Sequence, residues 1–141
     1  MSTPLSVYTG GTFDLFHWGH ARFLEQCSRL GDVCVSLNTD EFIQFYKGSN
    51  PVMSYQERLT TLESCKWVTS VIQNFGGADS KIAIESTMPD IIAVGSDWEG
   101  RDYYSQMGFT QNWLDARGIS LVYLPYTIGI SSTDIKNRLK S

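Results

Sequence analysis

The sequence is poor in cysteine and has no run of apolar residues as long as a membrane helix needs. Its three cysteines, Cys27, Cys34 and Cys65, are widely spaced and form no CxxC pair. A disulfide framework and a thiolate zinc site are therefore not expected. The polar stretch at residues 1–4 lacks the basic segment and cleavage pattern of a signal peptide. We expect a cytoplasmic protein that does not insert into a membrane.

Positive charge is also scarce, since 11 Lys and Arg residues against 15 Asp and Glu residues leave a net charge of −4. A broad nucleic-acid-binding surface needs the opposite balance, so nucleic acid is not expected as a partner. A site for phosphate groups would have to be local, built from a few basic side chains and backbone N–H groups. The length of 141 residues and the hydrophobic fraction of 42% predict one globular domain over residues 1–141.

Short apolar runs alternate along the chain with segments of helical periodicity. The pattern predicts strands at residues 5–9, 33–37, 68–73, 91–94 and 119–124. It predicts helices at residues 17–30, 39–46, 54–66, 79–87 and 131–139, and one more toward the end of residues 99–117. Such alternation predicts an α/β fold, a five-stranded parallel sheet with helices on both faces. Ligands in sheets of this kind bind at the carboxyl ends of the strands.

Several predicted helix ends carry capping signals. Ser54 with Glu57, and Ser131 with Asp134, have the spacing of a capping box. Gly31 follows the first predicted helix at the position where a left-handed cap is expected.

The two histidines of the chain, His17 and His20, lie three residues apart at the start of a predicted helix, shortly after the glycine pair at residues 10–11. Residues at this spacing share a helix face, and a helix N-terminus favours an anion. Both imidazoles are therefore predicted to donate hydrogen bonds to phosphate, and Gly19 permits a close approach to the backbone. The alternatives are a structural pair of histidines or a metal site with Asp14 as third ligand.

Two further strand ends carry unusual residues. Asp97 and Trp98 directly follow the fourth predicted strand, where an acid and an aromatic ring could hold a nucleoside or an acceptor. A tryptophan that closes the core explains this segment equally well. Hydroxyl residues at 131–133 open the last helix and suit phosphate, although a plain capping box also accounts for them.

The run from Gly11 to His20 resembles the HxGH signature of the nucleotidyltransferase superfamily, and more narrowly the cytidylyltransferases, above all the bacterial glycerol-3-phosphate cytidylyltransferases. The resemblance continues in residues 39–42, 54–58, 95–100 and 129–133 and covers nearly the whole chain. It implies a Rossmann-like sheet of strand order 3-2-1-4-5 and a homodimer. It also implies transfer of CMP from CTP to a small phosphorylated alcohol, foremost sn-glycerol 3-phosphate. Pyrophosphate would be released, and Mg²⁺ would travel with the triphosphate.

The resemblance also implies site residues. The catalytic positions are His17, His20 and Lys47. The nucleotide-binding positions are Thr9, Gly10, Gly11, Thr12, Phe13, Asp14, His17, Gly19, His20, Gly95, Asp97, Trp98, Tyr126, Thr127, Gly129, Ile130, Ser131, Ser132 and Thr133. The acceptor-binding positions are Asp40, Lys47, Arg58, Lys66, Lys81 and Trp98. No protein-held metal is expected, and each of the four basic residues in the acceptor set could instead be a solvated surface charge.

One position departs from the family pattern, because Tyr126 stands where the family has an arginine that supplies charge to the triphosphate. Tyrosine cannot supply that charge. Arg101, Lys136 or Arg138 could take its place. Otherwise the chain is a weakly active nucleotide-binding homologue.

A different nucleotide or acceptor is the other alternative. The chain could use ATP, or act on phosphocholine, phosphoethanolamine or a sugar phosphate. A quaternary amine would need an aromatic cage, for which the candidates are Tyr46, Tyr55, Trp98, Tyr103 and Tyr104.

Overall fold

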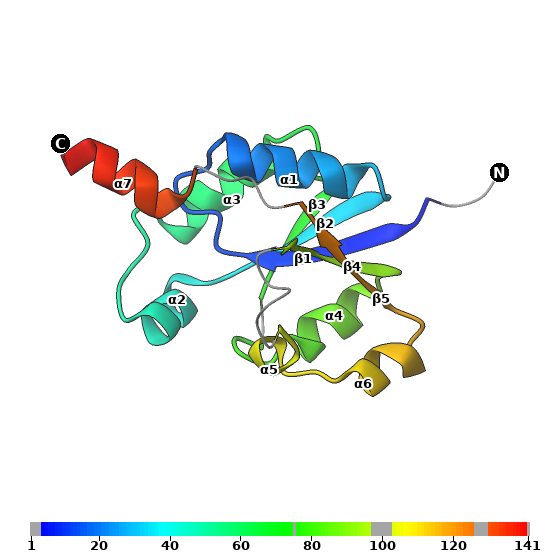
Figure 1. Cartoon of the computed structure of the whole chain (residues 1–141). Helices are drawn as coiled ribbons and strands as arrows, with labels where there is room; N and C mark the ends of the chain where they lie inside the picture. The colour runs from blue at the N-terminus through cyan, green and yellow to red at the C-terminus, as the bar shows by residue number, and fades with distance from the viewer. Residues whose placement is uncertain (1–3, 75, 97–102, 126–129, 141) are drawn as a thin grey trace.

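The computed structural model describes residues 4–74, 76–96, 103–125 and 130–140. Five parallel strands form one sheet in the order β3-β2-β1-β4-β5 (Figure 1). The strands are β1 (Ser6–Gly11), β2 (Asp32–Leu37), β3 (Ser70–Gln73), β4 (Ile91–Gly95) and β5 (Ser120–Leu124). The parallel sheet predicted from the alternating pattern is confirmed, and so is the strand order that the family resemblance implies.

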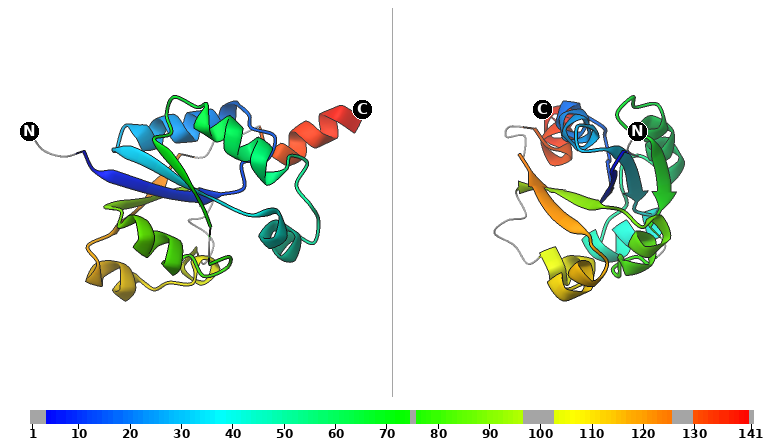
Figure 2. Two further views of the ribbon diagram at one scale, coloured as in Figure 1. Left: turned by 180° about the vertical axis from the view of Figure 1, so that it is seen from behind. Right: turned by 90° about the vertical axis from the view of Figure 1, so that its right-hand side faces the viewer.

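Helices cover both faces of this sheet, as Figures 1 and 2 show. One face carries α1 (Trp18–Ser28), α3 (Tyr55–Glu63) and α7 (Ser132–Lys140). The other carries α4 (Lys81–Thr87), α5 (Tyr103–Met107) and α6 (Gln111–Ala116). The short helix α2 (Asp40–Lys47) follows β2 at the carboxyl edge of the sheet. Within the described ranges, no helix combines the length and the apolar character that a bilayer crossing demands.

Neighbouring residues of β1 divide the core into two clusters. Val7 packs with Leu24 of α1 and Leu62 of α3, whereas Tyr8 packs with Ile84 of α4. Both strand residues are at most 1% exposed. Because successive side chains of a strand point to opposite faces, a central strand buried on both sides carries apolar residues at neighbouring positions, as Val7 and Tyr8 do here.

The prediction for Gly31 was wrong, for a local reason. Gly31 is not in a left-handed cap, because Arg29 ends α1 in the right-handed region. Glycine is needed there since a Cβ would lie 2.0 Å from the carbonyl oxygen of Leu5. The helix expected toward the end of residues 99–117 is confirmed as α6, whereas α5 before it was not predicted; Gly108, which adopts φ 80°, follows α5 and separates the two.

The helix caps predicted at Ser54 and Ser131 are confirmed. Ser54 and Glu57 form a complete capping box at the start of α3, although this helix ends at Glu63, three residues earlier than predicted. The Ser131 hydroxyl accepts the backbone N–H of Asp134 at 3.0 Å and so caps α7.

Candidate active site

The start of α1 holds the two histidines in a reciprocal cap. Nδ1 of His17 accepts the backbone N–H of Gly19 at 3.1 Å, and Nδ1 of His20 accepts the backbone N–H of His17 at 3.2 Å. Their rings stack with centroids 3.8 Å apart and an interplanar angle of 21°. The spacing of three residues therefore gives a stacked pair at the helix N-terminus.

This cap fixes what each ring can offer a ligand. A neutral imidazole whose Nδ1 accepts a hydrogen bond carries its proton on Nε2, so each ring has one N–H left to donate. Burial lowers the pKa of His17, and burial together with the adjacent His17 lowers the pKa of His20 to about 3, against the opposing effect of Asp14. His20 is consequently neutral at pH 7, and it can donate a hydrogen bond without bringing positive charge.

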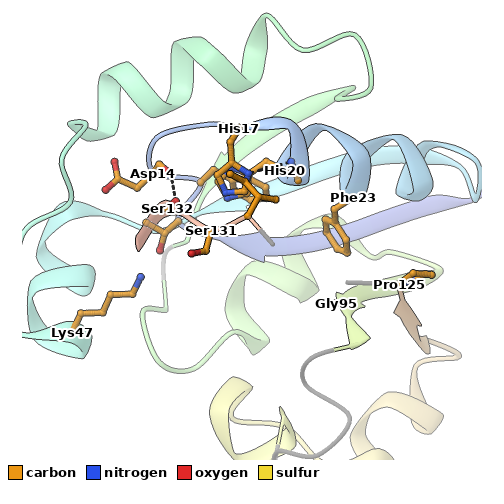
Figure 3. Close-up of a pocket in the computed structure, with 13 residues that line it drawn as sticks. Asp14, His17, His20, Phe23, Lys47, Gly95, Pro125, Ser131 and Ser132 are labelled. Carbon is orange, nitrogen blue, oxygen red and sulfur yellow. Dashed lines mark hydrogen bonds between the residues drawn. The ribbon is translucent and has the colours of Figure 1, made fainter. Parts of the chain in front are cut away.

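A cavity of about 440 Å³ lies beside the histidines, at the carboxyl ends of the strands (Figure 3). Its lining comes from the loop after β1, the first turns of α1 and α7, the end of α2, and the ends of β4 and β5. The lining residues are Thr12, Phe13, Asp14, His17, Gly19, His20, Phe23, Lys47, Gly95, Pro125, Ile130, Ser131 and Ser132. The structure thus brings together predicted nucleotide-binding residues from three distant parts of the sequence.

Asp14 makes hydrogen bonds that connect the loop after β1 to two other segments of the chain. Its carboxylate is 7% exposed, accepts the backbone N–H groups of Val52 and Met53 at 2.8 Å each, and lies 3.8 Å from Nζ of Lys136. Its backbone carbonyl accepts the hydroxyl of Ser132. The loop that carries Asp14 therefore fixes both the segment before α3 and the start of α7.

The same loop has an unusual backbone. Phe13 and Leu15, on either side of Asp14, have φ of 52° and 50°. This left-handed region costs a non-glycine residue about 1–2 kcal/mol. Close packing also leaves little room for a side chain at positions 11 and 19. A Cβ on Gly11 would lie 2.8 Å from the Phe13 ring, and one on Gly19 would lie 3.0 Å from the His17 ring. The tight fit holds the histidines against the cavity.

Arg58 has a different place from the predicted one. Its side chain is fully buried, its Nε donates to the carbonyl of Met53, and one terminal nitrogen donates to the carbonyls of Thr12 and Asn38. Its other terminal nitrogen donates to Asp40 at 2.6 Å. Direct contact with an acceptor phosphate does not fit this burial. Arg58 instead joins the loops that follow β1 and β2 to the start of α3.

The remaining residues of the predicted acceptor set are dispersed. The Asp40 carboxylate is engaged by Arg58 and by the backbone N–H of Tyr55. Lys66 lies over the Trp67 ring, 4.5 Å from its centroid, before β3 and so at the sheet edge opposite the cavity. Lys81 pairs with Asp79 at 3.9 Å and does not line the cavity. Among the described residues of the acceptor set, only Lys47, the last residue of α2, reaches the cavity lining.

The other predicted nucleotide-binding residues divide into three groups. Thr9, Gly10 and Gly11 line a smaller hollow of about 190 Å³ next to the main cavity, together with His20 and Gly95. Thr133 is exposed in the first turn of α7 and does not line the cavity. Asp97, Trp98, Tyr126, Thr127 and Gly129 lie outside the described residues.

A second cavity, of about 210 Å³, was not predicted. It shares Thr12 with the main cavity and is lined on its polar side by Tyr8, Asn38 and Asn74. Nδ2 of Asn38 donates to the Thr12 hydroxyl at 3.1 Å, and Nδ2 of Asn74 donates to Oδ1 of Asn38 at 3.0 Å. The sequence did hold a signal, because Asn38 and Asn74 each come directly after a strand, β2 and β3.

Comparison with known proteins agrees with this geometry. The family model described as cytidylyltransferase-like matches residues 8–138. Glycerol-3-phosphate cytidylyltransferase of Bacillus subtilis (strain 168) is 37% identical over 94% of this chain and 95% of its own length. The enzyme of the same name from Staphylococcus aureus (strain NCTC 8325 / PS 47) is 35% identical over 94% and 93%.

Solved structures give the same fold. The lipopolysaccharide core biosynthesis protein from Thermoplasma volcanium GSS1 has a TM-score of 0.69 at 25% identity and covers 88% of this chain and 97% of its own. Pantothenate synthetase from Thermus thermophilus shares the fold, with a TM-score of 0.62 at 14% identity over 99% of this chain and 66% of its own. With a family model that covers nearly its full length and relatives above 30% identity, the chain belongs to the cytidylyltransferase-like family.

Proposed function

We propose that this protein transfers CMP from CTP to sn-glycerol 3-phosphate, forming CDP-glycerol and pyrophosphate. The observation that carries the proposal is the pair of stacked, Nδ1-anchored histidines at a helix N-terminus that opens into the main cavity. The two relatives that share about a third of their residues with this chain over nearly its whole length carry the name of this activity.

The reaction is an in-line displacement. A phosphate oxygen of the acceptor attacks the α-phosphorus of CTP, the bond from the α-phosphorus to the bridging oxygen breaks, and pyrophosphate leaves with that oxygen. No protein nucleophile is needed, so the chain's contribution is positioning and stabilisation of developing charge. His17 and His20 donate from Nε2 to phosphate oxygens. Because His20 is neutral in the free protein, it donates its hydrogen bond from Nε2 without bringing positive charge.

Backbone groups and one lysine complete the phosphate side of the site. The hydroxyl of Ser131 is used as a helix cap, and that of Ser132 donates to the carbonyl of Asp14. The free N–H groups in the first turn of α7 are therefore the donors for the triphosphate, rather than these hydroxyl groups. Lys47, at the end of α2, adds positive charge to the lining, and Figure 3 shows its amino group pointing toward Ser132.

Mg²⁺ is expected to arrive with the triphosphate. In the part of the chain that the structure describes, no three His, Cys, Asp or Glu side chains gather where they could hold a metal ion. Asp14 is the one carboxylate among the described lining residues, and both of its oxygens already accept backbone N–H groups. The described residues therefore do not form a set of ligands for the ion.

The second cavity suits the alcohol end of the acceptor. Its described polar lining offers hydroxyl and amide groups from Tyr8, Asn38 and Asn74, and none of the described lining residues is a carboxylate that would favour a quaternary amine. Oδ1 of Asn74 is buried and accepts no hydrogen bond from the described residues, so a ligand hydroxyl can donate to it. Because the two cavities share Thr12, the phosphate of one acceptor can enter the main cavity while its glycerol hydroxyls occupy the second.

The aromatic cage of the alternative acceptor does not form among the described candidates. Tyr46 lines the second cavity. Tyr55 lies 5.7 Å from the Arg58 guanidinium, and the Tyr104 hydroxyl donates to Gln111 at 2.7 Å. Trp98 and the Tyr103 side chain are outside the described residues. A small polyol phosphate is therefore preferred over phosphocholine.

The test is product formation from purified protein with Mg²⁺, CTP or ATP, and a panel of acceptors. CDP-glycerol and pyrophosphate from CTP and glycerol 3-phosphate, with the highest kcat/KM of the panel, are expected. A higher kcat/KM for phosphocholine or for ATP, or no product with any pair, would refute the proposal. The homodimer and the cytoplasmic location remain predictions, which sedimentation and cell fractionation can check.

A further inference from the structure

The main cavity has little positive charge for a ligand as anionic as CTP. Among its described lining residues, Lys47 carries the positive charge and Asp14 the negative one, while His20 is neutral at pH 7. Even with its Mg²⁺, a triphosphate keeps negative charge that needs a further cation within reach, because unpaired phosphate charge loses its hydration on entering a protein site.

Lys136 of α7 is the nearest such group that an ion pair links to the lining. Its Nζ lies 3.8 Å from Oδ2 of Asp14, and its side chain is 40% exposed. It follows Ser132 by four residues, so it lies on the helix face that Ser132 presents to the cavity. The lysine therefore projects along the same side of α7 as the cavity lining.

The pairing of Lys136 with Asp14 is easily exchanged. A distance of 3.8 Å is longer than a hydrogen bond. Both carboxylate oxygens of Asp14 already accept backbone N–H groups, from Val52 and Met53. If Lys136 turns toward a bound anion, Asp14 keeps two hydrogen bonds and is not left unsatisfied.

The next base along α7 does not share this arrangement. Arg138 pairs with Asp134, one turn earlier in the same helix, at 2.8 Å. It lies two residues beyond Lys136 and so faces another side of the helix. The two side chains have the same sign of charge, but Asp14, which pairs with Lys136, lines the cavity, and Asp134, which pairs with Arg138, does not.

We propose that Lys136 binds the terminal phosphates of the nucleotide: its ammonium group moves from Asp14 to a β- or γ-phosphate oxygen when CTP enters. This inference rests on the proposed function. It explains how the protein neutralises the charge of the triphosphate although Tyr126 stands where the family pattern has an arginine. No covalent bond changes in this step, and the charge is in place when pyrophosphate leaves.

The experiment compares the affinity of CTP and of CMP for the unchanged protein, Lys136→Ala and Arg138→Ala, by calorimetry with Mg²⁺ present. Loss of one hydrogen bond to a charged group predicts that Lys136→Ala binds CTP about tenfold or more weakly. CMP lacks the terminal phosphates, so its affinity should change less than twofold, and Arg138→Ala should behave like the unchanged protein with both ligands. If Lys136→Ala lowers the melting temperature, the affinities of Lys136→Gln for CTP and CMP, measured in the same way, replace those of Lys136→Ala, because glutamine keeps most of the side chain and removes the charge.

The outcomes separate this inference from the proposal on which it rests. If the unchanged protein binds CTP but Lys136→Ala binds it equally well, the inference is overturned and the proposed function stands. If Lys136→Ala weakens CMP as much as CTP, Lys136 acts only on the shape of the site, and the inference is again overturned. If the unchanged protein does not bind CTP, both are overturned.

Discussion

His17 and His20 lie face to face with 3.8 Å between their ring centroids, and the Nδ1 atom of each accepts a backbone N–H at the start of α1. The pair stabilises the helix N-terminus and leaves an Nε2 donor on each ring. These two roles can be separated by substitution, because capping needs only a short acceptor while phosphate binding needs the donor on the far side of the ring.

His20→Ala is expected to lower kcat by about 10²–10³, as loss of one preorganised donor does. At position 17 two variants form a matched set. Asparagine caps helices well and alanine does not, so His17→Ala should lose about 1 kcal/mol of stability and His17→Asn little. Both should lose turnover. Turnover and thermal unfolding measured on all three variants check this, and near-normal turnover in any of them would remove the histidine concerned from the mechanism.

The partly buried His20 also predicts a dependence of stability on pH. The pKa of His20 in the folded protein is about 3, below its ordinary value of 6.5, and burial is the main cause. Below pH 6.5, His20 binds a proton in the unfolded chain but not in the folded protein. The free energy of unfolding therefore falls as the pH falls, by up to about 1.4 kcal/mol per pH unit for this group.

The variant His20→Gln removes this proton and keeps a hydrogen-bond acceptor at the helix start. Between pH 6.5 and 5, its free energy of unfolding should decline less steeply than that of the unchanged protein. Urea titrations at several pH values measure both slopes. Parallel curves would mean that His20 takes up its proton in the folded state as readily as in the unfolded chain.

Arg58 gives a prediction about stability rather than affinity. Its side chain is fully buried and donates to the carbonyls of Met53, Thr12 and Asn38 as well as to Asp40. Arg58→Ala leaves these acceptors without donors, and we expect a loss of about 3 kcal/mol or more. The exposed Lys66, replaced by alanine, should change stability by less than about 0.5 kcal/mol. A stable Arg58→Ala with a raised KM for the acceptor would restore the binding role predicted from the family resemblance.

Arg58 also shows where sequence-based prediction reaches its limit. The periodicity of apolar residues and the positions of glycine and proline are local properties of the sequence, and they predicted the alternating strands and helices and the parallel sheet. The histidine pair was predicted because its two members are three residues apart. Arg58, in contrast, donates to Thr12, 46 residues earlier in the chain. No local pattern distinguishes such a buried arginine from one that binds a ligand.

The same reason explains other differences. The need for glycine at position 31 comes from the carbonyl of Leu5, which belongs to the segment leading into β1. The contact of Lys136 with Asp14 joins the last helix to the loop after the first strand. Sequence motifs identified the chemical groups at the carboxyl edge of the sheet, whereas only the folded arrangement tells which bases reach the cavity.

Tyr8 tests the acceptor end of the proposed site. Its side chain is 1% exposed and lines the second cavity, and burial raises the pKa of its hydroxyl to about 12, so the group stays protonated as a donor. Tyr8→Phe should raise KM for glycerol 3-phosphate about three- to tenfold, the effect of one neutral hydrogen bond, with KM for CTP unchanged. The matched control is Tyr104→Phe, since the Tyr104 hydroxyl bonds to Gln111. Equal KM values for the acceptor in the two variants would exclude the second cavity as its binding site.

The last prediction joins Lys136 to Tyr126. The residues at 126–129 lie outside the described part of the chain, but Pro125 and Ile130 on either side of them both line the main cavity. An arginine at position 126 would bring a fixed charge and a planar set of donors that fits a phosphate. If Lys136 already binds the terminal phosphates, Tyr126→Arg should bring little gain in the unchanged protein, because the added charge duplicates one that is present.

In the Lys136→Ala background the same substitution should act differently. Tyr126→Arg should there recover most of the lost kcat/KM for CTP, about tenfold or more, since a charge-assisted hydrogen bond is regained. The four proteins form a double-mutant cycle whose coupling energy measures the exchange of one cation for the other. If the effects of the two substitutions on kcat/KM are additive, this exchange is contradicted, because Lys136 and position 126 would then act on different parts of the nucleotide. A large gain from Tyr126→Arg alone would mean that the phosphates of CTP lack a cation even with Lys136 in place.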